Sequence, residues 1–105
     1  MKKALLVCGV LAACAANRPA EEAFRRVMDA QVGKRADDPD FYPVYYRLRQ
    51  ADSKRLPSGN SEEEYRAGRK GDCRLVFETT PGTRTVVRWR IEGPTGDCVI
   101  LPPGA

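Results

Sequence analysis

The clearest pattern in the chain is the alternation of hydrophobic and polar residues in two segments of its C-terminal half. In "CRLVFETT" one face carries Cys73, Leu75 and Phe77 and the other carries Arg74, Val76 and Glu78. In "RTVVRWRIEG" one face carries Val87, Trp89 and Ile91 and the other carries Val86, Arg88, Arg90 and Glu92. A period of two is typical of strands with one buried face. A more polar strand is predicted before them, around Glu62 to Ala67, after a turn at Pro57 to Asn60.

The two alternating segments are expected to form a hairpin. A slip of one residue would turn one strand's apolar set to solvent, so Leu75 and Phe77 must share a side with Val87, Trp89 and Ile91. A loop of odd length such as Pro81–Thr83 satisfies this condition and places Cys73 across from Ile91. A two-residue loop would instead place Leu75 opposite Arg88, so the odd loop is predicted.

The segment "NRPAEEAFRRVMDAQVGK" is predicted to be an amphipathic helix. Pro19 suits its first turn and Gly33 suits its end. Residues at spacings of three and four share one side: Ala20, Phe24, Val27, Met28 and Gln31. We expect this stripe to pack on the core.

The segment "RADDPDFYPVYYRLRQADSK" permits two interpretations. Either Asp38 or Asp40 caps a short helix with Pro43 in its first turn, or "VYYRLR" is a strand. We favour the helix, whose shared side would hold Phe41, Val44, Tyr45 and Leu48. The tyrosines are expected to be half-buried packing residues with hydrated hydroxyls rather than a stacking platform: Tyr42, Tyr45 and Tyr46.

The start of the chain has the features of an export signal. Met1-Lys2-Lys3 precedes the uncharged run "ALLVCGVLAA", which is about half of the roughly 20 residues that span a membrane. The string Leu11-Ala12-Ala13-Cys14 resembles the lipobox of bacterial lipoproteins. That resemblance implies a signal peptide over 1–13, a lipidated Cys14 carrying diacylglycerol and a fatty acid such as palmitate, and a tether over 14–18. The alternative is ordinary signal cleavage beside a chance cysteine.

The same resemblance predicts where the protein is found. Ala15 is not the aspartate that retains enteric lipoproteins in the inner membrane, so the periplasmic face of the outer membrane is favoured. Two or three acyl chains hold a protein firmly, whereas one holds it marginally. Only about five residues separate Cys14 from the helix, a reach of about 17 Å, so the domain over 19–105 is expected to lie close to the membrane. Arg25 and Lys34 lie near the tether but are interpreted as part of a solvated helix face.

Four cysteines constrain the exported domain. Cys8 lies in the leader and Cys14 is assigned to lipid, which leaves Cys73 and Cys98 as an even pair in a setting where disulfides persist. Closing that loop would contribute about 3 to 4 kcal/mol. The chain has no histidine and no CxxC pair, which argues against a metal site. The predicted class is therefore α+β, with one or two N-terminal helices packed on a three-stranded antiparallel sheet and one disulfide.

Composition and charge narrow the function. Without Lys2 and Lys3 the 18 basic residues become 16 against 14 acidic ones, a formal charge of +2, which argues against nucleic-acid binding. No histidine and no G-x-S-x-G elbow is present, so an enzyme is disfavoured and no cofactor or small-molecule substrate is expected. The run Glu62–Glu64 is predicted to be a solvated edge, with Glu63 pointing away from its neighbours.

The order of motifs also resembles a protein family. The lipobox, "VGK", "LPSGNSEEEYR", "GDCRLVFET", "VVRWRIEG" and "DCVILP" are similar to small, largely uncharacterised lipoproteins of Gram-negative bacteria. More distantly, they resemble outer-membrane lipoproteins of the SmpA/OmlA type, in which helices pack on a three-stranded sheet and which assist barrel-protein assembly. The Gly-Met-Thr signature of that second group is missing, so the resemblance implies architecture and address only.

Two functions follow as hypotheses. The first is an accessory lipoprotein that binds an envelope protein, with Arg88, Arg90 and Glu92 as the candidate partner surface because they lie opposite Trp89. The second is an inhibitor or immunity-type lipoprotein that blocks a lysozyme or toxin with an exposed loop, either "PSGNS" or "GPTGD".

Overall fold

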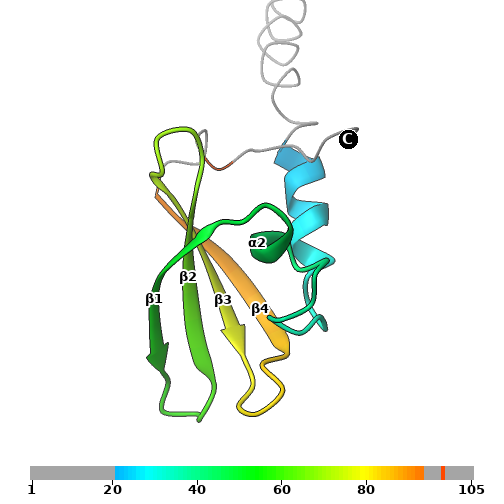
Figure 1. The fold of residues 1–105 in the computed structure, drawn as a ribbon, viewed down its shortest axis with the longest axis vertical. Coiled ribbons are helices and arrows are strands. Elements are labelled where there is room, and N and C mark those ends of the chain that lie inside the picture. The colour runs from blue at the N-terminus through cyan, green and yellow to red at the C-terminus, as the bar shows by residue number, and fades with distance from the viewer. Residues whose placement is uncertain (1–20, 94–97, 99–105) are drawn as a thin grey trace, which may run out of the picture.

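The computed structural model describes residues 21–93 and Cys98 (Figure 1). A helix covers residues 21–29, and it is followed by α2 (Tyr42–Tyr45), β1 (Arg49–Arg55), β2 (Ser61–Ala67), β3 (Cys73–Thr79) and β4 (Val86–Glu92). The strands form one antiparallel sheet in the order β1-β2-β3-β4. The α+β class, the antiparallel sheet and the disulfide are confirmed. The predicted strand number is wrong, because the described part of the chain has four strands rather than three.

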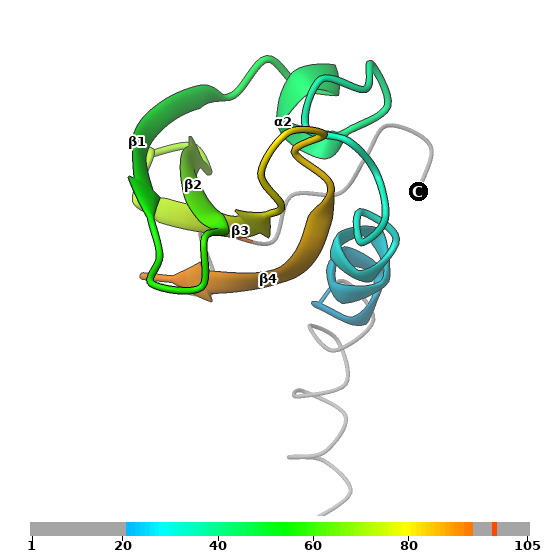
Figure 2. The ribbon, with the colours of Figure 1, turned by 90° about the horizontal axis from the view of Figure 1, so that it is seen from below.

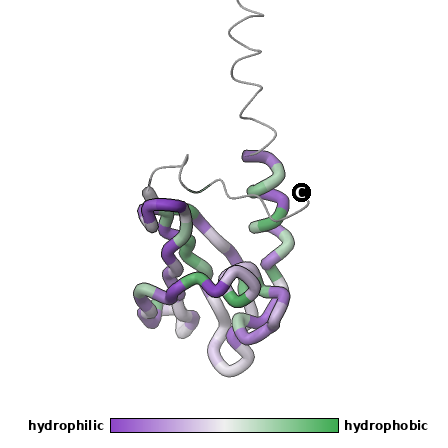
Figure 3. The backbone as a smooth tube through the Cα atoms, turned by 45° about the horizontal axis from the view of Figure 1, so that its top comes forward, coloured by the Kyte–Doolittle hydropathy of each residue, from purple (hydrophilic) through white to green (hydrophobic). Residues whose placement is uncertain are grey.

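Both helices lie on the same side of a curved sheet. Figure 2 shows α2 on the concave side, the N-terminal helix beside β4, and β1 at the opposite edge. The core between these layers consists mainly of Phe24, Met28, Phe41, Tyr42, Tyr65, Leu75, Phe77 and Val86. Hydrophobic and hydrophilic positions follow one another along the strands and the N-terminal helix in Figure 3, as expected of elements with one buried face.

The predicted helix face is confirmed over the described residues. Phe24 and Met28 are buried, and Ala20 lies outside the described residues. Gln31 is also buried, because its amide satisfies two backbone groups. Its Nε2 donates to the Val27 carbonyl at 2.7 Å, and its Oε1 accepts from the Tyr42 amide at 2.8 Å. This one side chain therefore joins the N-terminal helix to α2.

The prediction of a short second helix is confirmed, but its cap and its buried side are not. The N-cap is Phe41, which makes no capping side-chain hydrogen bond, and the Asp38 carboxylate accepts from the Asp40 amide instead. Phe41 is fully buried whereas Val44 is exposed. A helix of one turn is too short to have a continuous apolar stripe. The buried residues are therefore those at its start rather than residues at helical spacing.

The tyrosine hydroxyls differ from the prediction as well. Those of Tyr42 and Tyr46 are buried and have no hydrogen-bond partner among the described residues, whereas Tyr45 is exposed. Burial, together with the neighbouring Tyr46, raises the pKa of Tyr42 to about 12. The rings of Tyr42 and Tyr46 lie 4.7 Å apart, so ring packing sets their positions.

The strand that sequence reasoning missed is β1. All seven of its residues are exposed, so it has no apolar alternation to detect. It forms because a predicted turn brings it beside β2: the Leu56 amide donates to the Asn60 carbonyl at 2.8 Å, and Gly59 supplies a φ of 95°. Backbone pairing rather than burial therefore holds β1 in the sheet.

In the β3–β4 hairpin the predicted faces are confirmed and the predicted loop is wrong. Leu75 pairs with Ile91 and Phe77 with Trp89. The Thr80 amide donates to the Thr85 carbonyl, so the loop is Pro81–Arg84. It has an even number of residues, whereas an odd number was predicted.

A register shift next to this loop restores the faces. Thr79 pairs with Val86 but Glu78 pairs with Arg88, so Val87 is an extra residue. Val86 consequently enters the core, although the alternation placed it on the other face. The longer loop and the extra residue together move the register by two residues from the predicted one. Ile91 therefore pairs with Leu75 rather than with Cys73.

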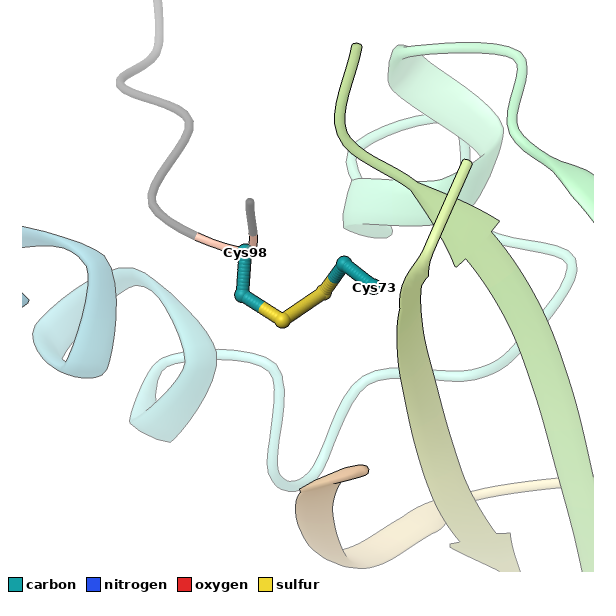
Figure 4. Close-up of a disulfide and its surroundings, with 2 residues drawn as sticks. All are labelled: Cys73 and Cys98. Carbon is teal, nitrogen blue, oxygen red and sulfur yellow. A yellow bond between two sulfur atoms is a disulfide. The ribbon is translucent and has the colours of Figure 1, made fainter. Parts of the chain in front are cut away.

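The predicted disulfide joins Cys73 and Cys98 (Figure 4). Their Cα atoms are 4.8 Å apart and both residues are completely buried. The segment beyond Cys98 lies outside the described residues. Residues 33–36 cover the start of β4: the Gly33 amide donates to the Val86 carbonyl, and the Val86 amide donates to the Lys34 carbonyl, both at 2.8 Å.

Candidate functional site

The three residues predicted as a partner surface all lie on the convex side of the sheet, away from the helices. Arg88, Arg90 and Glu92 occupy alternate positions of β4, and the Arg88 side chain is 74% exposed. We call this side of the sheet, with the alternate residues of all four strands that project from it, the outer face. The helices lie on the opposite side, so no described helix covers the outer face (Figure 2).

Strand register arranges the outer face in three rows that cross the sheet. The basic row is Arg49, Arg66, Arg74 and Glu92. The middle row is Asp52, Glu64, Val76 and Arg90. The distal row is Lys54, Glu62, Glu78 and Arg88. Counting charges, the basic row carries a net +2, the middle row −1 and the distal row zero, so positive charge is concentrated at one end.

Arg90 is the centre of the ion pairs on the outer face. Its guanidinium makes two hydrogen bonds to the Glu62 carboxylate, and its Nε donates to Glu92 Oε2 at 2.8 Å. Lys54 Nζ lies 3.7 Å from Glu62 Oε1. The hydrogen bonds from Arg90 lower the pKa of Glu62 and of Glu92, and those same bonds raise the pKa of Arg90. All three groups are therefore charged at neutral pH.

Further contacts fix the rest of this surface. Glu78 accepts from the Asn60 amide at 2.7 Å, and its other oxygen lies 3.2 Å from Arg88 Nε. Val76 is the one apolar side chain in the three rows, and it is 3% exposed because the long polar side chains around it cover it. The outer face therefore presents charges that are already held in place, so binding would cost little side-chain entropy.

A second cluster, on the concave side, was not predicted. Glu63 is 3% exposed, yet it is a carboxylate. Arg84 Nη2 donates to Glu63 Oε1 at 2.6 Å and Arg84 Nε to Oε2 at 3.1 Å. The Tyr65 hydroxyl donates to Oε1 at 2.8 Å and the Thr79 hydroxyl to Oε2 at 3.0 Å. Both carboxylate oxygens thus accept two hydrogen bonds each.

The electrostatics of this cluster favour the charged form. Burial opposes ionisation of Glu63, but the hydrogen bonds from Arg84, Tyr65 and Thr79 and the charge of Arg84 lower its pKa below the ordinary value. Burial and the hydrogen bond to Glu63 raise the pKa of Tyr65, so the hydroxyl keeps its proton. The pair fastens the β3–β4 loop to β2, since Arg84 comes from that loop in a left-handed conformation with φ 54°.

The prediction of a solvated edge for Glu62–Glu64 is therefore wrong. β2 is an interior strand, between β1 and β3. Glu63 does point away from its neighbours, as predicted, but towards the core. The signal was in the sequence: Glu63 shares its parity with Tyr65 and Ala67, both of which are buried.

Other predicted residues fall in different places. Cys14 and the segment 94–97 of "GPTGD" lie outside the described residues, and "PSGNS" forms the compact loop between β1 and β2. The structure contains no helix, within the described ranges, that is long and apolar enough to cross a membrane. Over the same ranges, no group of three or more potential metal ligands is found.

Comparison of the chain with protein-family models, with characterised proteins and with solved structures finds no match.

Proposed function

We propose that this chain is a lipid-anchored, non-catalytic binding protein of the Gram-negative cell envelope. In this proposal Cys14 tethers it to the periplasmic face of the outer membrane, and the outer face of its sheet binds an envelope protein. The observation that carries the proposal is the outer face itself, a four-stranded surface that no described helix covers and on which the charges around Arg90 are fixed by ion pairs.

Two properties of this surface favour a protein partner. It is broad, because it extends over all four strands, and its charges form a fixed pattern that a partner of complementary charge can recognise. Arginine is also enriched in protein–protein interfaces, and Arg88 combines high exposure with an ion pair to Glu78. Its exposed guanidinium group can therefore donate hydrogen bonds to a partner.

The anchor is tested by fractionation and mass spectrometry. The natural chain is expected in the membrane fraction with an acylated N-terminal Cys14, and the Cys14→Ser variant is expected in the soluble periplasm. Recovery of the unmodified, uncleaved chain from the cytosol would refute this part of the proposal.

The binding surface is tested by site-specific photo-cross-linking in the producing bacterium. A photoreactive residue at position 88 is expected to give one discrete protein adduct, and the adduct should disappear when Arg90→Glu is added. A matched probe at position 26, exposed on the helix, should give no such adduct. Identical adducts from both positions, or none from position 88, would contradict the proposed surface.

The inhibitor or immunity function is kept as a second candidate on one observation. The β1–β2 and β3–β4 loops lie together at the end of the sheet opposite the start of the N-terminal helix (Figure 1). The first of these loops contains "PSGNS" and is closed by the Leu56–Asn60 hydrogen bond. If the loop blocks an active site, Ser58→Trp should abolish protection against lysozyme or a competitor's toxin in a growth assay, while Arg88→Glu should leave protection intact.

A further inference from the structure

The end of the sheet that holds the basic row carries positive charge with few matching anions. Arg66 has Arg49 as its direct neighbour on β1 and Arg74 as its direct neighbour on β3. Like charges directly opposite each other on neighbouring strands are destabilising. Arg69 and Lys70, both exposed, follow in the turn after β2 and add to the same end.

Only part of this positive charge is compensated within the described residues. Arg74 Nη1 lies 3.6 Å from Glu92 Oε1, and Arg66 Nε lies 3.5 Å from Glu64 Oε2. Arg49 and Lys70 form no ion pair with any residue in the described part of the chain. Asp72, in the same turn, adds one negative charge with its own interaction. The end as a whole therefore remains positive.

The two cations that are unpaired within the described residues, Arg49 and Lys70, lie together with Arg66 around a hollow in the surface. The hollow is lined by Arg49, Gln50, Ala51, Arg66, Lys70 and Gly71. Guanidinium and ammonium groups are the side chains that proteins use for phosphate, because they combine positive charge with several hydrogen-bond donors. We call this site the basic hollow and define it by its three cations, Arg49, Arg66 and Lys70.

The basic hollow lies at the same end of the domain as the chain that leads to the anchor. The Gly33 amide bonds Val86 at the start of β4, and Trp89 Nε1 donates to Asp29 Oδ1 at 2.9 Å further along that strand. The N-terminal helix thus runs antiparallel to β4, and residue 21 lies towards the end of β4 that carries the basic row. Figure 1 shows the start of the helix and the β2–β3 turn at the same end.

We propose that the basic hollow binds the phosphate groups of anionic phospholipid headgroups. The proposal rests on the membrane tethering proposed above, because a lipid on Cys14 would hold residue 21 within about 25 Å of the bilayer. A tethered domain meets membrane phosphate at a far higher effective concentration than free phosphate. The hollow would orient the domain with its two hairpin loops pointing away from the membrane.

The residues of the basic hollow are not the basic residues that lie near the tether in the sequence. Among the basic residues near the tether, Arg26 pairs with Glu22, Arg35 with Asp37, and Lys34 donates to the Asp40 carbonyl. Lys34 and Arg35 also lie beside the start of β4, at the far end of the helix from residue 21. Arg25, exposed in the second turn of the N-terminal helix, also lies towards the anchored end, and the basic hollow adds cations from the middle of the chain.

The test is vesicle co-flotation of the full chain carrying Cys14→Ser, so that binding does not depend on lipidation. Arg49→Gln is compared with Arg55→Gln, a matched control with the same charge change at the other end of the same exposed strand. Vesicles of phosphatidylcholine alone are compared with vesicles containing one third phosphatidylglycerol, and the ratio of the two affinities is measured. Every variant carries the same leader, so comparing this ratio between variants cancels the contribution of the leader, including that of Lys2 and Lys3. Circular dichroism verifies that both variants are folded.

Arg49→Gln, and likewise Lys70→Gln, should reduce the preference for phosphatidylglycerol about fivefold, the effect of about 1 kcal/mol per basic residue at a membrane surface. Arg55→Gln should leave it unchanged. An equal loss of the phosphatidylglycerol preference in all three variants would mean that the whole charge of the domain attracts it to the membrane. That result would overturn the proposed site. If inorganic phosphate binds to the hollow with saturation but the protein shows no preference between the two kinds of vesicle, the assignment of lipid as the ligand is overturned. Fractionation of the Cys14→Ser strain tests the anchor separately, so the two proposals can fail independently.

Discussion

Replacing one member of the buried Glu63–Arg84 pair should have a very different effect from replacing the other. The Glu63 side chain is 4% exposed whereas that of Arg84 is 46% exposed. In Arg84→Met the carboxylate keeps only the Tyr65 and Thr79 hydroxyls as donors and loses the positive charge that compensates its burial. In Glu63→Gln the freed guanidinium can turn outwards and be hydrated.

The expected magnitudes follow from this asymmetry. Removing one partner from a buried pair costs about 3 to 5 kcal/mol, and the exposed side of Arg84 places Arg84→Met near the lower value, about 3 kcal/mol. Glu63→Gln retains an acceptor for Tyr65 or Thr79 and should cost about 1 kcal/mol, the net value of a hydrogen bond. The double variant should resemble Glu63→Gln, which gives a coupling energy of about 3 kcal/mol. Methionine keeps a β-carbon, so the strain of the positive φ at position 84 is unchanged.

The assay is urea unfolding of the oxidised protein, followed by circular dichroism, for the natural chain and the three variants. Its pH dependence tests the electrostatic origin. In the natural chain the lowered pKa of Glu63 contributes stability above the ordinary carboxyl pKa of 4.5, and this contribution is lost as the pH falls through the folded-state pKa. In Arg84→Met burial dominates, so the pKa should lie above the ordinary value and protonation should relieve the penalty. The difference in free energy of unfolding between the natural chain and Arg84→Met should therefore be large at pH 7 and small near pH 4.

Two results would refute this reasoning. If Arg84→Met and Glu63→Gln cost the same free energy of unfolding, the desolvation of Glu63 is not the controlling factor. If the gap between the natural chain and Arg84→Met is the same at pH 7 and pH 4, the lost interaction is packing rather than charge.

Three further changes test other parts of the fold by the same unfolding measurement. Cys73→Ala combined with Cys98→Ala should lower the free energy of unfolding by about 3 kcal/mol, and an unchanged midpoint would show that the bond contributes nothing. Tyr42→Phe should be neutral or stabilising, because it removes a buried hydroxyl without a partner among the described residues; a loss above 1 kcal/mol would reveal a hidden partner. Gly93→Ala should cost about 3 kcal/mol, because its φ is 103° and an added β-carbon would lie 2.6 Å from the Asp72 carbonyl oxygen, whereas Gly82→Ala, with φ 80° and open space, should cost about 1 kcal/mol. Equal losses at the two glycines would contradict the close approach at Gly93.

The parts of the fold that sequence predicts are those in which burial decides the structure. The alternation in β3 and β4 specifies which residues face the core, and the pairing of Leu75 with Ile91 confirms it. The stripe of Phe24 and Met28 is confirmed for the same reason. Cysteine usage is equally informative, because assigning Cys8 and Cys14 to an export signal leaves Cys73 and Cys98 as the expected pair, and these two form the disulfide.

The parts that sequence missed are those in which backbone pairing or a long-range partner decides. β1 has no buried residue, so no hydrophobic pattern can indicate it. Glu63 was misassigned because its partner, Arg84, is 21 residues away and only the hairpin brings the two together. A charged residue at a core-facing parity can be recognised from sequence, but the cation that makes its burial possible cannot.

The charge pattern of the outer face depends on a detail of the same kind. The β1–β2 register shifts between Gln50 and Asp52, so that Arg49 lies opposite Arg66. With regular pairing from Asp52 onwards, Gln50 would occupy that position and Arg49 would project from the other side of the sheet. The shift therefore creates a row of three neighbouring arginines from residues that a regular strand would separate. The basic hollow is thus a property of the register rather than of any local run of basic residues, which is why a chain with almost balanced charge can present a concentrated positive site.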